Sequence, residues 1–153
     1  MKNLVIFALV ILFVLIAFIY KFFVAAPPST SGLTTLKIGE QEFQVEVAKD
    51  DVSRSRGLSG REYMAREQGM LFIFDTAGNH GFWMKGMKFS LDIVWIREGR
   101  IVGFSENLPP VDEGLRPPPI YYPPEVADMV LEINAGLVQK YEFKVGDPIM
   151  YNN

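Results

Sequence analysis

The chain has 153 residues, a formal net charge of −3, 49% hydrophobic side chains, no cysteine and a single histidine, His80. These totals exclude a disulfide framework, a thiolate zinc site and a cysteine nucleophile, and the acidity excludes nucleic acid as a general partner, because phosphate binding needs a basic face. We expect no cofactor and no metal ion, since one histidine and scattered carboxylates form no ligand spacing.

The N-terminus is strongly apolar. Of the first 26 residues 23 are hydrophobic, and no charge occurs between Leu4 and Tyr20. Residues 4–26 can cross a bilayer if Lys21 snorkels to the interface. We predict a transmembrane anchor over residues 1–26 that contacts the lipid bilayer, which makes the protein a single-pass protein of the cell membrane. The alternative is a cleaved signal sequence ending at the small residues 24–26, but Pro27 follows them directly and the apolar run exceeds a usual signal core.

A polar linker over residues 27–33 then leads to one predicted extracytoplasmic β-domain, residues 34–153. Beyond residue 26 the chain has 13 basic and 18 acidic side chains, a net charge of −5. The length suits one hydrophobic core.

The first half of this domain alternates apolar and polar residues with period two, which is typical of strands. Thr35–Ile38 and Phe43–Val47 flank a Gly39-Glu40 turn and predict a hairpin. Asp50-Asp51 caps a predicted short helix that Gly57 ends, and Arg61–Gln68 is a second helical or loop stretch. Further strands are predicted at 70–74, 80–87 and 91–96.

The second half contains a turn at Glu98-Gly99 into a strand at 100–104, followed by seven prolines between Pro109 and Pro124. Proline density predicts an extended loop there rather than a regular element. A strand at 129–133, a helix over 135–140 capped by Asn134 and a last strand at 149–151 complete the prediction. The fold class is mainly β: a compact, mostly antiparallel domain with one or two short helices, arranged as a meander.

Several strings of the domain carry a family resemblance: RSRGL, GMLFIF, FWMK, LDIVWI, VLEINAG and VGD. Over about Gln44–Met150 the chain resembles the exported family called domain of unknown function 192. The resemblance implies a mostly antiparallel β-structure with a short helix near each end and no established activity. It places the family's characteristic positions at residues 56–58, 61, 69–72, 74, 82–85, 91–92, 131–132 and 135–136. The chain departs from the family pattern at Gly86-Met87, where Asn-Thr is usual, and at Ser90, where proline is usual.

Candidate site residues follow from the same strings. Side-chain period two places Trp83 and Lys85 on one side of a strand. Arg61 from the preceding loop and Asp92 from the next strand complete a predicted ligand-binding set for an anionic or sugar-like ligand. In the alternative interpretation Trp83 packs in the core and the charged residues form a structural ion-pair network.

Three functions remain open from the sequence. The preferred one is a binding or assembly module at the cell surface, whose partner is a small ligand or an envelope protein, with Tyr121 and Tyr122 of the proline segment as candidate partner-binding residues. An envelope hydrolase is the first alternative. No catalytic residue is assigned, but the candidates are the carboxylates Asp92 and Glu132, with Lys85 as electrophile and Arg61 beside them. The second alternative is a structural subunit of a surface assembly.

Overall fold

The computed structural model describes residues 32–111 and 117–152. The predicted membrane segment and nearly all of the linker lie outside these ranges. Among the residues described, none forms a helix with the length and apolarity needed to span a membrane.

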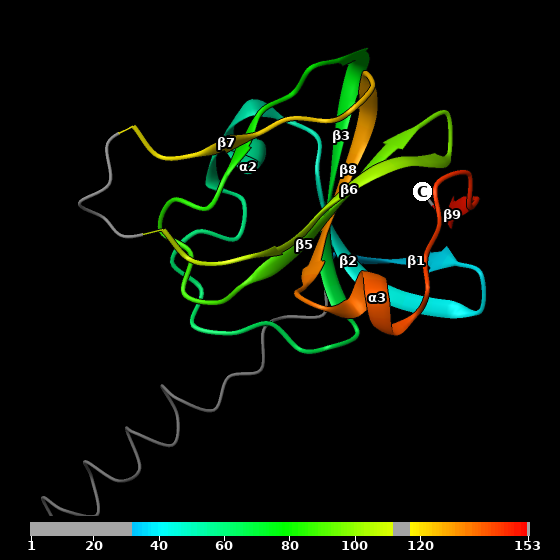
Figure 1. The fold of residues 1–153 in the computed structure, drawn as a ribbon, viewed down its shortest axis with the longest axis horizontal. Helices are drawn as coiled ribbons and strands as arrows, with labels where there is room; N and C mark the ends of the chain where they lie inside the picture. The colour runs from blue at the N-terminus through cyan, green and yellow to red at the C-terminus, as the bar shows by residue number, and fades with distance from the viewer. Residues whose placement is uncertain (1–31, 112–116, 153) are drawn as a thin grey trace, which may run out of the picture. The chain divides into compact units, whose positions relative to one another are not determined.

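Seven strands form one strongly curled sheet, in the spatial order β6-β5-β8-β3-β2-β1-β9 (Figure 1). A separate two-stranded ribbon joins β4 to β7. The mainly β prediction is therefore confirmed. The strands are β1 (Leu33–Ile38), β2 (Gln41–Ala48), β3 (Gln68–Gly78), β4 (Phe82–Trp83), β5 (Leu91–Arg97), β6 (Arg100–Leu108), β7 (Ile120–Tyr121), β8 (Ala127–Asn134) and β9 (Ile149–Tyr151).

Elements fixed by local signals form where the sequence predicts them. The β1–β2 hairpin turns at Gly39, which has a positive φ of 57°. Helix α2 (Asp51–Arg56) begins with a capping box, in which the Asp50 carboxylate accepts from the Ser53 N–H and the Ser53 hydroxyl oxygen accepts from the Asp50 N–H. These local contacts satisfy backbone donors at the helix start.

The predicted meander is wrong. Strand β8 lies between β5 and β3 and is antiparallel to both, whereas β3 runs parallel to β2. The parallel pairing arises because β2 and β3 are joined by a crossover containing α2 rather than by a tight turn, and parallel neighbours need such a connection.

The two ends of the sheet meet. Arg100 at the start of β6 bridges to Pro148, just before β9, and the Ile149 N–H donates to the Gly99 carbonyl at 2.8 Å. Because the sheet is curled, backbone groups near the start of β6 pair with those near the start of β9. This pairing protects the two edge strands from pairing with another chain.

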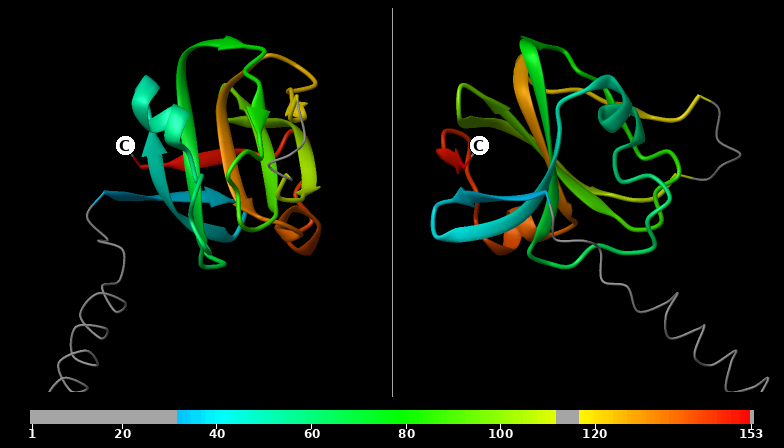
Figure 2. Two further views of the ribbon diagram at one scale, coloured as in Figure 1. Left: turned by 90° about the vertical axis from the view of Figure 1, so that its left-hand side faces the viewer. Right: turned by 180° about the vertical axis from the view of Figure 1, so that it is seen from behind.

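Hydrophobic side chains fill both faces of the sheet. Helix α3 (Leu137–Lys140) and β9 cover one face, and the α2 crossover with the β4–β7 ribbon covers the other (Figures 1 and 2). We call them the α3 face and the α2 face. The buried residues of the α3 face are Leu36, Ile38, Phe43, Val45, Leu71, Val94, Ile96, Ile101, Leu131, Ile133, Leu137, Val138 and Ile149. Those of the α2 face are Ala48, Leu58, Met64, Met70, Phe72, Met84, Met87, Leu91, Ile93, Trp95, Leu108 and Val130.

Two local predictions need correction, and one open alternative is decided. The strand predicted over 80–87 shrinks to β4, because a turn at Gly86, with φ of 72°, ends it. The proline segment does contain a strand, β7, which pairs with β4. Of the two alternatives for the stretch after Arg61, the structure shows the loop, over residues 61–67, and Gln68 already begins β3.

The last helix begins two residues later than predicted, and Asn134 does not cap it. Gly136 precedes α3 with φ of 81° and makes no side-chain cap. The Asn134 amide instead donates to the carbonyls of Met64 and Ala65, at 3.1 and 3.0 Å. Asn134 thereby ties the end of β8 to the loop that precedes β3.

Candidate functional site

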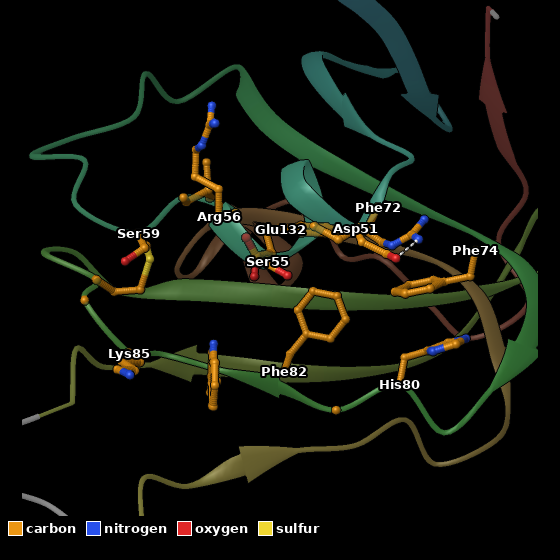
Figure 3. A pocket seen from close by; sticks show the side chains of 17 residues that line it. Asp51, Ser55, Arg56, Ser59, Phe72, Phe74, His80, Phe82, Lys85 and Glu132 are labelled. Carbon is orange, nitrogen blue, oxygen red and sulfur yellow. Dashed lines mark hydrogen bonds and ion pairs between the residues drawn. The ribbon is translucent and has the colours of Figure 1, made fainter.

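A cavity of about 610 Å³ opens on the α2 face of the sheet. Its volume falls within the usual range for small-molecule sites. Its walls come from α2 and the loop after it, from β3, and from the segment running through β4 to Met87, and Glu132 of β8 also lines it (Figure 3). The rings of Phe72, Phe74, Phe82, Trp83 and His80 make the aromatic part of the lining.

Glu132 is a buried acid in an apolar setting. Alternation along β8 turns Leu131 and Ile133 toward the α3 face and Val130 and Glu132 toward the α2 face. Burial raises the pKa of the Glu132 carboxyl to about 8, and the nearby Arg61 guanidinium opposes this rise only in part. The group is therefore mostly protonated at neutral pH, when it can donate as well as accept a hydrogen bond.

Arg61 is fixed by an ion pair. Its two terminal nitrogens contact the two carboxylate oxygens of Glu46 at 2.5 and 2.6 Å, and this contact lowers the pKa of Glu46 and raises the pKa of Arg61. Glu46 and Glu132 flank Met70 in one row across the α2 face of the sheet. Arg61 thus acts on Glu132 through its charge but does not line the cavity.

Trp83 and Lys85 lie at the cavity together. The Trp83 side chain is 52% exposed, and the Lys85 Nζ lies 5.5 Å from the centroid of its ring. That distance is within the range of a cation–π contact. Both residues line the cavity, so a ligand there can meet an aromatic face and an ammonium group at once.

Asp92 is on the other side of the sheet. It pairs with Ile133 in β8, whereas its neighbour Ile93 pairs with Glu132. Its fully buried carboxyl accepts the N–H of Asn107 at 2.7 Å and the N–H of Val138 at 3.0 Å. Asp92 therefore joins β5, β6 and the first turn of α3, and the sheet separates it from Glu132, Lys85 and the cavity.

The two tyrosines of the proline segment differ. Tyr121 in β7 pairs with Phe82 and packs against the core of the α2 face. Tyr122 is 56% exposed. Tyr122 is thus the more exposed of the two, because Tyr121 is half-buried.

Several cavity residues were not predicted as site residues. Arg54 of α2 pairs with Asp51 at 2.7 Å, and its guanidinium carbon lies 5.3 Å from the Phe74 ring centroid. The His80 ring stacks on the same Phe74 ring, and the two ring centroids lie 3.6 Å apart. In the sequence, the arginines of RSRGL and the lone histidine were the signals that could have indicated these residues. Whether these side chains come together depends on how the crossover that contains α2 folds onto β3. In the described ranges 32–111 and 117–152, no group of carboxylates and histidine is placed to hold a metal ion.

The comparisons agree with this architecture. The family model of DUF192, described as "Uncharacterized ACR", matches residues 34–151. A crystal structure from Sinorhizobium meliloti 1021, of a protein described as a candidate transcription regulator, is 32% identical, with 78% of this chain and 92% of that chain covered and a TM-score of 0.68. A protein of unknown function from Novosphingobium aromaticivorans DSM 12444 is 26% identical, with 82% and 91% covered and a TM-score of 0.70.

No curated protein matches the chain. The family match covers all but the last two residues of the predicted β-domain, and it includes the strands and the crossover that form the cavity. The chain belongs to the DUF192 family.

Proposed function

We propose that this protein is a membrane-anchored extracytoplasmic binding module whose cavity takes a small, sugar-like ligand with an acidic group. The observation that carries the proposal is the meeting of Glu132, Trp83 and Lys85 in one cavity of about 610 Å³. The aromatic ring offers a flat apolar face, the ammonium attracts an anion, and the protonated carboxyl can donate to a hydroxyl or carboxylate oxygen. The net charge of −5 beyond residue 26 provides no general basic face for nucleic acid, so an acidic ligand is held only by local cations such as Lys85 at the cavity.

Replacing Lys85 by alanine is expected to weaken binding of galacturonate about tenfold, because the variant loses a charge-assisted contact. Titration calorimetry on the full-length chain, in a detergent without a sugar head group, measures the change. Lys140→Ala is the matched control, since the Lys140 Nζ also lies over an aromatic ring, 4.9 Å from the Tyr141 centroid, but far from the cavity lining. Equal losses in the two variants, or galactose binding as tightly as galacturonate, would contradict the proposal.

Binding of galacturonate is also expected to weaken about tenfold between pH 7 and pH 9. The pKa of Glu132 is about 8, so the carboxyl ionises in this interval and then repels an anion. Glu132→Gln retains a neutral donor and acceptor and should bind with the same affinity at both pH values. A wild-type affinity that does not change with pH would place the ligand away from Glu132.

A hydrolase is the second candidate, and one observation favours it: Glu132 is protonated at neutral pH, as a general acid must be, and lines the cavity with Lys85. Glycoside hydrolysis ordinarily needs a second carboxyl beside the first. Asp92 lies on the opposite face of the sheet, and Asp51, the other acid of the cavity lining, is paired with Arg54. We therefore expect galacturonate oligomers to stay intact with the protein. Release of shorter sugars by the wild type but not by Glu132→Gln would establish hydrolysis instead.

The membrane anchor is tested separately. We expect the full-length chain to remain in the membrane pellet after alkaline carbonate extraction, because residues 4–26 have the length and apolarity of a transmembrane helix. Protease added to intact spheroplasts should then digest or release the C-terminal domain. Recovery of the full-length chain in the carbonate supernatant would contradict the anchor.

A further inference from the structure

The β4–β7 ribbon exposes one apolar face. Trp83 pairs with Ile120, and residues paired across antiparallel strands point to the same side. A Cβ built on Gly81 would lie 2.7 Å from the Ile120 Cγ2 and 2.9 Å from the Tyr122 Cε1, so these two side chains lie next to each other against Gly81. Ile120 is 46% exposed, and Tyr122 is exposed to a similar extent as Trp83. Trp83, Ile120 and Tyr122 therefore form one outward surface, which we call the ribbon platform.

The ribbon platform is continuous with the cavity. Trp83 belongs to both, because it lines the cavity and also stands on the outward side of β4. The inward residues of the same ribbon, Phe82 and Tyr121, pack against the core of the α2 face and hold the ribbon in place. A ligand too long for the cavity would thus leave it across Trp83 and reach Ile120 and Tyr122.

Charge near the cavity favours an anionic ligand. Among the arginines near the site, Arg54 is paired with Asp51 and Arg61 with Glu46. Arg56 and Lys85 are exposed, line the cavity and take part in none of the ion pairs of the described residues. Lys85 lies over the Trp83 ring and Arg56 lines the same cavity, so two cations are available there for the carboxylates of a ligand.

The form of the surface distinguishes a glycan from a peptide. An extended peptide gains affinity by adding a strand to a sheet edge, but β4 and β7 are only two residues long and offer it almost no backbone pairing. The ribbon platform instead presents rings and an aliphatic side chain, against which the apolar face of a sugar can lie while its hydroxyl groups remain hydrated.

We propose that the ligand is an acidic polysaccharide, of which one terminal uronic acid unit enters the cavity and the following units lie on the ribbon platform. This inference rests on the proposed function and specifies its ligand. It requires that affinity grows with chain length, and that the gain depends on Tyr122 and Ile120, which do not line the cavity.

The test compares galacturonate with its hexamer on the full-length chain, by calorimetry in the same detergent. We expect the hexamer to bind at least tenfold more tightly than the monomer. Tyr122→Ala and Ile120→Ala should each weaken the hexamer about threefold and leave the monomer unchanged, whereas Trp83→Ala should weaken both. Tyr63→Ala is the matched control, since Tyr63 is 75% exposed but does not line the cavity or belong to the ribbon.

A hexamer that binds no more tightly than the monomer would overturn the inference and leave the proposed function in place. The inference would also be overturned if Tyr122→Ala weakened binding of the monomer as much as binding of the hexamer. A hexaglutamate peptide of the same charge should bind far more weakly than the galacturonate hexamer, and equal affinity would replace the glycan by an acidic peptide. Failure of monomer and hexamer alike would overturn the inference and the proposed function together.

Discussion

Replacing Asp92 by alanine is expected to lower the free energy of unfolding by about 3–5 kcal/mol. The variant leaves the buried N–H of Val138 and the partly buried N–H of Asn107 without their acceptor, and an unsatisfied buried donor costs about 1–3 kcal/mol. The small cavity left by the side chain adds to the loss. Urea unfolding followed by tryptophan fluorescence measures the change.

Two comparisons separate this structural role from a role in binding. Asp92→Asn keeps one acceptor oxygen and should lose about half as much stability as Asp92→Ala. The folded fraction of either variant should bind galacturonate like the wild type, because Asp92 is on the α3 face and the cavity is on the α2 face. A stable Asp92→Ala protein that no longer binds would return Asp92 to the site.

The free energy of unfolding is expected to be roughly 3 kcal/mol lower at pH 8 than at pH 5.5 through Glu132 alone. Burial raises the pKa of Glu132 from an ordinary 4.5 to about 8 in the folded state. Between these values the folded chain keeps a proton that the unfolded chain releases. This contribution to stability is therefore complete below pH 4.5 and is lost as the pH rises toward 8.

Glu132→Gln should remove this dependence, because the amide is neutral at every pH. Its unfolding midpoint in urea should exceed that of the wild type at pH 8 and approach it near pH 5. Glu125→Gln, a change at an exposed acid, is the control and should leave the pH profile unchanged. Parallel pH profiles of the wild type and Glu132→Gln would show that Glu132 is ionised in the folded protein.

The contrast between Asp92 and Glu132 shows what the sequence can predict about this site. Glu132 stands in β8, which also carries half-buried residues, whereas Asp92 lies within a run, Leu91–Ile96, that is buried on both faces. Alternation cannot tell which face such a strand turns to the ligand. The proximity of Trp83 and Lys85 was predictable, because it depends on two residues of one short segment.

The fold likewise has parts that the sequence predicts and parts that it does not. Hairpins and the cap of α2 follow from contacts within a few residues, and the sequence predicts them at nearly the right positions. The insertion of β8 between β5 and β3, and the seating of α2 beside Phe74, depend on partners far away along the chain. Periodicity carries no information on which strand becomes the neighbour of which.

The central position of β8 in the sheet also determines when, during synthesis of the chain, the sheet can form completely. Strands β3 and β5 are not neighbours, and each pairs with β8 along most of its length. A chain synthesised only as far as Val126 lacks β8, the strand that joins the β5–β6 pair to β1, β2 and β3 in the sheet. Pairings between such distant segments form slowly. The cavity, which has Glu132 in its wall, is therefore complete only after nearly the whole domain has been made, so a chain that ends before β8 lacks it.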